Sequence, residues 1–178
     1  VTADAVATMA EKVSVASGLA DFAGCHTVVE AIFENLEVKQ QVFSDLENHV
    51  SADCLLTSNT SSLPIGSIAR VCKNPERVAG FHFFNPVPLM KVIEVVGGID
   101  TNEAVVDTLL KLATRLGHTG VRAQDTPGFI VNHAGRAYST EGLKILEERV
   151  APIEDIDRIL REEAGFRMVP LELFDLTG

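Results

Sequence analysis

The sequence predicts an α/β fold with a largely parallel sheet, followed by an all-helical segment. Short β-branched runs alternate with amphipathic helical patterns up to Gln124, as expected for parallel strands joined by covering helices. From Asp125-Thr-Pro-Gly128 onward only helical patterns remain. The composition, 46% hydrophobic and 22% charged, is typical of a folded globular chain. We therefore expect an α/β domain over residues 1–126 and the start of a helical domain over residues 127–178.

Periodicity and turn-forming residues predict the individual elements. The predicted strands are short apolar runs bounded by turn formers: Val13–Ser17, Thr27–Ile32, Cys54–Thr57, Val78–Phe84, Val92–Val96 and His118–Gln124. The predicted helices carry apolar residues at helical spacing: Ala3–Lys12, a helix after Ile32 that includes Leu36, Phe43, Leu46 and Val50, then Pro64–Ala69, Asn102–Leu116, Phe129–Val150, Ile153–Ala164 and Pro170–Leu176. Gly117 stands where glycine most often ends a helix.

Charge and cysteine content exclude several classes of protein. The formal net charge of −10 argues against a nucleic-acid partner, which requires a basic face. The longest apolar runs, such as Val92–Val96, are too short to cross a bilayer, and no signal peptide is evident at the start. Three cysteines (Cys25, Cys54 and Cys72) lack the spacing of metal ligands, and their odd number favours free thiols. We expect a cytoplasmic protein with no metal, no nucleic-acid partner and no membrane partner.

Two of the predicted apolar strands each carry one ionisable residue. His82 lies in Phe81-His-Phe-Phe84, and Glu94 lies in Val92-Ile-Glu-Val95. If the loop Asn85–Lys91 reverses the chain symmetrically about Pro88, residues whose numbers sum to 176 face each other. His82 and Glu94 meet this condition. Because a buried carboxylate is costly without a partner, we expect the two side chains to pair.

The predicted pair has two interpretations. It fits a structural contact that ties two strands together, or a general base held in one tautomer by a carboxylate. The Asn-Pro turn beside it favours catalysis, but periodicity alone leaves the type of reaction open.

Four longer motifs resemble the 3-hydroxyacyl-CoA dehydrogenases in order and spacing. They are Val29-Glu-Ala-Ile-Phe-Glu-Asn35, Ser58-Asn-Thr-Ser-Ser-Leu63, Gly80-Phe-His-Phe-Phe-Asn-Pro-Val-Pro-Leu-Met-Lys-Val-Ile-Glu-Val-Val96 and Asp125-Thr-Pro-Gly-Phe-Ile-Val-Asn132. The tail Gly165–Gly178 is similar to the second helical unit of the same family. The resemblance covers nearly the whole chain. The motif sequences are most similar to those of bacterial enzymes of fatty-acid and phenylacetate-type degradation.

The resemblance implies a fold and a reaction. The fold would be part of a Rossmann-like NAD-binding domain, followed by a helical domain similar to the C-terminal domain of 6-phosphogluconate dehydrogenase. The reaction would be oxidation of an (S)-3-hydroxyacyl-CoA to the 3-oxoacyl-CoA with NAD as cofactor. His82 would take the proton of the 3-hydroxyl group, Glu94 would orient His82, and Ser61 and Asn132 would contact the substrate.

The resemblance also implies a cofactor side of the site. Glu34, Lys39, Ser61 and Asn85 match positions along the ribose and nicotinamide. Each position has a simpler alternative. Glu34 and Lys39 fit a solvated first helical turn, Ser61 fits a turn or helix N-cap for which Ser62 competes, and Asn132 fits an ordinary polar residue at a domain face. His26, His49, His118 and His133 show no partner pattern, and we expect them to be surface residues or residues without a role in the site.

The sequence departs from the family pattern in two respects. No two of its glycines are two residues apart, so the Gly-x-Gly-x-x-Gly turn that holds a pyrophosphate is absent. We therefore expect residues 1–178 alone to bind NAD poorly or not at all. The start within a helix-like stretch, Ala3–Lys12, and the end on Asp175-Leu-Thr-Gly178 predict that both ends are incomplete. Val169 stands where the family usually has glycine, which puts the local packing in doubt.

The resemblance implies an acyl-CoA substrate as one partner. A second copy of the chain is the other expected partner, because the apolar faces of the helical segment exceed what it can bury alone. Two alternatives to a dehydrogenase are a non-catalytic structural relative, similar to a lens crystallin, and an acyl-CoA-binding protein without redox activity. The β-hydroxyacid dehydrogenases also join a Rossmann domain to a helical domain. They use a catalytic lysine on a helix, and no lysine here has a comparable placement.

Overall fold

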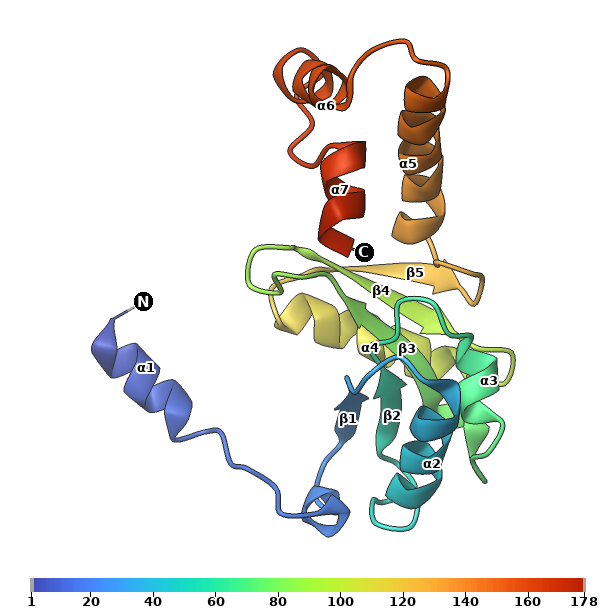
Figure 1. Ribbon diagram of the computed structural model, residues 1–178. Helices are drawn as coiled ribbons and strands as arrows, with labels where there is room; N and C mark the ends of the chain where they lie inside the picture. Colours follow the sequence, from blue (N-terminus) through green and yellow to red (C-terminus); the bar gives the residue numbers. More distant parts are fainter. Residues whose placement is uncertain (1, 178) are drawn as a thin grey trace. The chain divides into compact units, whose positions relative to one another are not determined.

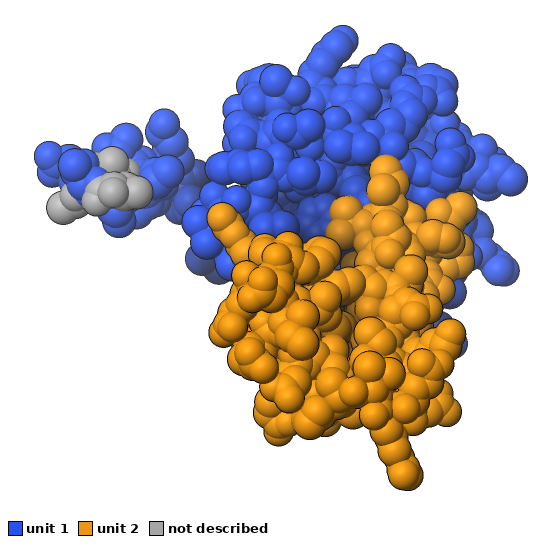
Figure 2. All heavy atoms as spheres, turned by 90° about the horizontal axis from the view of Figure 1, so that it is seen from above, with its two compact units in different colours: residues 1–125 blue, residues 126–178 orange. Residues whose placement is uncertain are grey.

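The structure, a computed structural model, describes residues 2–177. The chain divides after Asp125 into two compact units, which Figure 2 colours separately. Val1 and Gly178, which bear on the expectation of incomplete ends, lie outside the described residues.

A five-stranded sheet forms the first unit (Figure 1). Its strands are β1 (Thr27–Glu30), β2 (Leu55–Ser58), β3 (Val78–Phe83), β4 (Val92–Gly97) and β5 (Thr119–Gln124), and they lie side by side in chain order. All neighbouring strands run parallel except β3 and β4, which form an antiparallel hairpin. The predicted α/β class with a largely parallel sheet is therefore confirmed.

Four α-helices belong to the described part of this unit: α1 (Ala3–Ala10), α2 (Leu36–Leu46), α3 (Ile65–Ala69) and α4 (Glu103–Arg115). Short 3₁₀ turns at Leu19–Phe22 and Pro75–Arg77 complete the secondary structure of the unit. Side chains cap two of the helices, because Asn35 accepts a hydrogen bond from the Val38 amide and Asn102 accepts one from the Ala104 amide. Such caps satisfy amide groups that have no partner inside the helix.

The alternation of side chains along β3 and β4 divides the hairpin into two faces. Ala79, Phe81, Ile93 and Val95 are fully buried and pack against α4. Each large apolar side chain buried in this way contributes roughly 1.5–3 kcal/mol. The other face carries Gly80, His82, Glu94 and Val96 and is turned toward α3, as the proximity of Gly80 to the Ile65 side chain shows. α2 and α3 lie on this face of the sheet, and α4 covers the opposite face (Figure 1).

The predicted strand at Val13–Ser17 is wrong. This segment has no regular secondary structure, and Val13 and Val15 are 74% and 96% exposed. A β-branched run becomes a strand only where another strand supplies ladder hydrogen bonds. The described part of the chain places no strand beside this segment.

The described residues of the second unit form three helices: α5 (Val131–Glu147), α6 (Ile153–Glu162) and α7 (Pro170–Thr177). α5 and α7 approach closely, and a Cβ added to Gly142 would lie 2.6 Å from the Pro170 ring. Val169 is fully buried beside this contact and does not adopt a positive φ, so the valine packs without the backbone strain that its β-branched side chain could have caused. None of the helices in residues 2–177 is long and apolar enough to span a membrane.

Candidate active site

The carboxyl ends of three parallel strands define the candidate site. β1, β2 and β3 run in the same direction, so Glu30, Ser58 and Phe83 all end at the same edge of the sheet. In open α/β sheets, ligands bind outside this edge. The amide of Asn59 donates to the carbonyl of Glu30 at 2.8 Å, which joins the ends of β1 and β2.

His82 and Glu94 form a direct pair on the β3–β4 hairpin. The antiparallel register places them opposite each other, as the predicted symmetry about Pro88 requires. His82 Nδ1 lies 2.7 Å from Glu94 Oε2. A carboxylate only accepts hydrogen bonds, so Nδ1 carries the proton that it donates to Glu94, and the basic lone pair of the neutral ring lies on Nε2.

The pair is almost removed from solvent. His82 is 5% exposed and Glu94 is 1% exposed, and the ring of His82 packs against Phe84 with 4.6 Å between ring centroids. In such surroundings the charge of Glu94 is screened little by water. The arrangement can therefore stabilise a proton that arrives on the imidazole and keep the ring in one orientation.

The turn Ser58–Ser62 follows β2 at the same edge. Asn59 Oδ1 accepts a hydrogen bond of 2.8 Å from the amide of Phe83, the residue next to His82. This bond ties the turn to β3 and holds it beside the His82–Glu94 pair. Asn59 was not singled out in the sequence, although its place between a strand end and a serine-rich turn is a detectable signal.

Ser61 and Ser62 are held by a carboxylate on another segment. Glu34 Oε1 accepts hydrogen bonds from the Thr60 hydroxyl at 2.6 Å, the Ser61 amide at 3.1 Å and the Ser62 hydroxyl at 3.2 Å. Ser61 is a turn residue, and the N-cap position of α3 belongs to Pro64. The interpretation of Ser61 as the N-cap of α3 is therefore wrong, and its contact with the substrate oxygen stays a prediction.

Lys39 is buried, so its assignment to a solvated helical turn is wrong. The residue is 1% exposed, and its ammonium lies 2.7 Å from Glu30 Oε1 and 3.3 Å from Glu34 Oε2. The physical reason is the carboxylate of Glu30, which ends β1 and draws the ammonium inward. A glutamate that closes an otherwise apolar strand, nine residues before a lysine, was the signal that sequence reasoning missed.

Opposing effects set the pKa of Glu34. Burial acts to raise the pKa of this carboxyl group, but the hydrogen bonds from Thr60 and from the Ser61 amide, together with the charge of Lys39, lower it more. The net pKa lies below the ordinary value of 4.5. Glu34 therefore presents an ionised acceptor at the edge of the sheet, with 37% of its side chain exposed.

Two further predicted site residues lie at exposed positions. Asn85 is exposed and precedes Pro86 through a cis peptide bond. Asn132 is the second residue of α5 in the other unit, where it is exposed. Three of the remaining histidines are exposed, as expected: His26, His49 and His133. His118 is half-buried, with its Nε2 3.2 Å from the carbonyl of Val87.

The residues present fit one part of a dinucleotide. Carboxylate and hydroxyl groups at the carboxyl edge match the hydroxyls of a ribose and the polar groups of a nicotinamide. The chain contains no Gly-x-Gly pair to cradle a pyrophosphate. In residues 2–177 no group of three or more His, Cys, Asp or Glu side chains could hold a metal ion.

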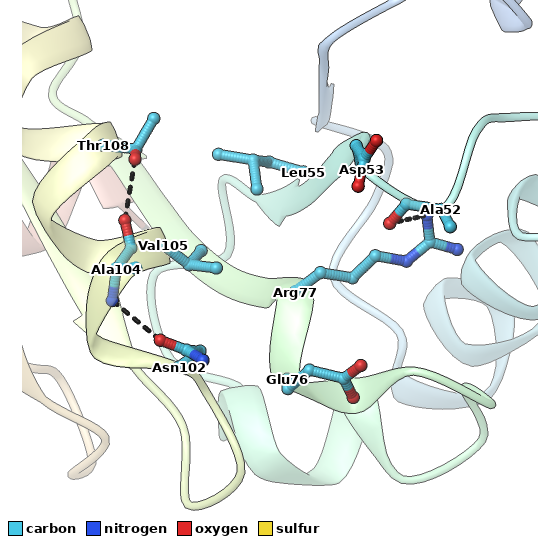
Figure 3. Close-up of a pocket in the computed structure, with 9 residues that line it drawn as sticks. All are labelled: Ala52, Asp53, Leu55, Glu76, Arg77, Asn102, Ala104, Val105 and Thr108. Carbon is cyan, nitrogen blue, oxygen red and sulfur yellow. Dashed lines mark hydrogen bonds between the residues drawn. The ribbon is translucent and has the colours of Figure 1, made fainter.

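A separate pocket lies at the opposite edge of the sheet (Figure 3). Its lining includes Asp53, Glu76 and Arg77, which precede β2 and β3, and Asn102, which caps α4. The Arg77 guanidinium turns toward the carbonyls of Ser51 and Ala52 and binds Glu47 at 3.2 Å. These contacts give the arginine a structural role away from His82.

Comparisons with known proteins agree with this geometry. Residues 1–126 match the family model described as 3-hydroxyacyl-CoA dehydrogenase, NAD binding domain, and residues 128–178 match the C-terminal domain of the same family. A 3-hydroxyadipyl-CoA dehydrogenase of Escherichia coli is 51% identical over 156 residues, which are 88% of this chain and 33% of the relative. The human mitochondrial hydroxyacyl-coenzyme A dehydrogenase is 43% identical over 85% of this chain and 48% of its own length.

A solved structure shares the fold over the whole chain. The crystal structure of a 3-hydroxybutyryl-CoA dehydrogenase from Escherichia coli superposes with a TM-score of 0.95 and 46% identity, over 100% of this chain and 38% of the other. The sheet unit and the helical unit that follows it correspond to the two domain models of this family. The chain belongs to the 3-hydroxyacyl-CoA dehydrogenase family. It spans between a third and a half of the length of these two relatives.

Proposed function

We propose that the protein oxidises the 3-hydroxyl group of an (S)-3-hydroxyacyl-CoA to the 3-oxo group, with NAD as its cofactor and His82 as general base. The observation that carries this proposal is the buried hydrogen bond between His82 and Glu94, 2.7 Å long, at the ligand-binding edge of the sheet. Such a pair suits proton abstraction from an alcohol. The names of the relatives supply the substrate class.

The proposed chemistry assigns one role to each residue. His82 Nε2 takes the proton from the 3-hydroxyl group, and Glu94 stabilises the imidazolium that results. Ser61 contacts the substrate oxygen, and Asn132 completes the substrate site. NAD, when bound, supplies the acceptor for the hydride that leaves C3.

Glu34, Lys39, Ser61 and Asn85 form the cofactor side in this proposal. The clustering of Glu34, Lys39 and the turn that contains Ser61 supports the assignment. Residues 1–126 would be the C-terminal part of the NAD-binding domain. Residues 127–178 would begin the helical domain that binds substrate and forms the dimer.

We further propose a cytoplasmic homodimer that pairs through the helical unit. In this unit several large apolar side chains are 44–52% exposed: Leu143, Ile153, Ile159, Phe166 and Met168. A second copy could cover such surfaces. Sedimentation of the intact protein as a monomer would contradict the dimer. A mitochondrial location, as printed for two relatives, would contradict the cytoplasmic assignment.

Turnover by the intact protein tests the reaction. We expect loss of NADH absorbance when acetoacetyl-CoA is added, and a fall in kcat of about 10²–10⁴-fold for His82→Ala. The circular dichroism spectrum of the variant should remain that of the wild type. Full turnover by the variant would show that His82 is not the base. Tight acyl-CoA binding without oxidation of NADH would favour a binding protein, and a folded protein that binds neither ligand would favour a structural relative.

A further inference from the structure

One turn residue links the ends of the three parallel strands at the candidate site. Asn59 follows β2 directly and is half-buried. Its backbone amide donates to the Glu30 carbonyl at the end of β1, and its side-chain Oδ1 accepts from the Phe83 amide at the end of β3. Both hydrogen bonds are 2.8 Å long. Asn59 therefore reaches from one neighbouring strand to the other, although none of the proposed roles belongs to it.

The side chain of Asn59 continues a ladder that the backbone of β2 leaves unfinished. β2 and β3 pair as far as Ser58 and Gly80, and β3 then runs on to Phe83. The ladder with β2 stops before the Phe83 amide, for which Asn59 Oδ1 supplies the acceptor. A backbone amide shielded from water is costly without an acceptor. The Asn59 side chain thus takes the place of a strand carbonyl.

The bond joins two backbone segments that carry proposed catalytic groups. Ser61 follows Asn59 in the turn, and His82 precedes Phe83 in β3. The ring of Phe83 packs against that of Phe81, with 5.0 Å between the ring centroids, on the side of the hairpin that α4 covers. Phe83 is therefore held in place by the core, and Asn59 fastens the turn to it.

Other hydrogen bonds hold the turn from a different direction. Glu34 accepts three of them, from groups in residues 60–62. These three bonds connect the turn with the segment between β1 and α2, whereas the Asn59 bond connects it with the strand that carries His82. The separation between Ser61 and His82 therefore depends on Asn59.

We propose that Asn59 is a positioning residue: it sets the separation between the Ser61 hydroxyl and the His82 imidazole, the two groups that meet the 3-hydroxyl oxygen of the substrate. This inference rests on the proposed function and adds a residue that touches neither substrate nor cofactor. Reacting groups displaced by about 1 Å lose roughly a hundredfold in rate. Loss of the Asn59 acceptor lets the turn move away from β3 and slows the chemical step, while Glu34 still holds the turn on its other side.

The test compares two variants of Asn59 in the intact protein. Asn59→Ala removes the acceptor, whereas Asn59→Asp keeps an acceptor oxygen at the same position. With NADH and acetoacetyl-CoA, we expect kcat to fall about 10–100-fold in Asn59→Ala, and both KM values to stay within about threefold of the wild type. In Asn59→Asp, kcat should return to within about threefold of the wild-type value, because the bond to the Phe83 amide is kept.

Thr101→Val is the matched control on the same strand. The Thr101 hydroxyl donates to the Val78 carbonyl at 2.6 Å, at the start of β3 and so at the opposite edge of the sheet. This variant should lower the melting temperature, as Asn59→Ala does, and leave kcat unchanged. An equal fall of kcat in both variants would attribute the loss to a weakened β3 and refute the positioning role. If Asn59→Ala does not fold, Asn59→Ser takes its place, because its hydroxyl is too short to reach the Phe83 amide.

A double-mutant cycle tests whether Asn59 acts through Ser61. In a Ser61→Ala background, Asn59→Ala should change kcat by less than about threefold, because the hydroxyl that Asn59 positions is absent. Three results would each overturn the inference: an unchanged kcat in Asn59→Ala, no recovery in Asn59→Asp, or the full loss in the Ser61→Ala background.

Hydrogen exchange without ligands gives a measurement that does not depend on turnover. Residues 58–63 and 82–84 should exchange faster in Asn59→Ala than in the wild type, and at the wild-type rate in Asn59→Asp. A wild-type protein that binds NADH but does not reduce acetoacetyl-CoA would contradict the proposed function. The exchange comparison would then still decide whether Asn59 fastens the turn to β3, and equal exchange in Asn59→Ala and the wild type would show that it does not.

Discussion

At the scale of the residue, the pairing of His82 with Glu94 was predicted from the sequence pattern alone. Two ionisable residues in apolar strands, symmetric about Pro88, predicted the register that the sheet adopts. Local pattern failed for Lys39, which fits a solvated first helical turn in the sequence but is buried in the structure. The partner of Lys39 comes from a strand nine residues earlier, and local periodicity does not contain that contact.

The charge of Glu94 can be tested separately from its shape. Glu94→Gln keeps the size of the side chain and removes the negative charge that supports a protonated His82. We expect kcat to fall about 100-fold with little change in KM, because the charge acts mainly when the proton has moved. Steady-state kinetics with NADH and acetoacetyl-CoA check this. An equal loss of kcat in Glu47→Gln would attribute the effect to general destabilisation.

At the scale of the element, tertiary pairing decides which patterns become strands. Thr27–Glu30 and Val13–Ser17 have similar β-branched sequences, but only the first lies beside another strand and forms one. α4 was predicted almost to the residue, because Asn102 marks its start and Gly117 follows its end with a φ of 79°.

Glu47 links the end of α2 to the loop before β3 and should make stability depend on pH. Burial acts to raise the pKa of its carboxyl group, but the amides of Lys73 and Asn74 and the charge of Arg77 lower it more, to below 4.5. Because the folded-state pKa is the lower one, the carboxylate stabilises the fold above pH 4.5, and this contribution is lost as the pH falls through the folded-state pKa.

We therefore expect Glu47→Gln to lower the free energy of unfolding by about 2 kcal/mol at pH 7. The difference from the wild type should shrink as the pH falls below 4.5. Urea denaturation at several pH values measures both quantities. A difference that stays constant down to pH 3 would show that the charge of Glu47 contributes nothing.

At the scale of the whole molecule, two compact units follow one another along the chain. The first unit is built on a sheet and the second on helix contacts, so a substitution in one should leave the core of the other intact. Gly142 in α5 offers a test, because its Cβ position is occupied by the Pro170 ring of α7.

Gly142→Ala should destabilise the helical unit by about 1–3 kcal/mol through overpacking. Gly135→Ala is its matched control in the same helix, since nothing lies within 4 Å of that Cβ position, and it should stabilise the helix by about 0.5–1 kcal/mol. Hydrogen exchange measured by mass spectrometry should show faster exchange in residues 126–178 for Gly142→Ala and unchanged protection of the sheet. Equal loss of protection in both units would contradict their independence.

The sequence by itself determined the α/β class, the helices with clear caps, and the facing positions of His82 and Glu94. These features depend on local periodicity, on turn chemistry and on a hairpin whose two strands are close in sequence. Only the tertiary structure decided that Val13–Ser17 is not a strand, that Lys39 is buried, and that Glu30 joins β1 to α2 and the turn after β2. The physical reason is that ladder partners and buried ion pairs come from distant parts of the chain, and their energy appears only when those parts meet.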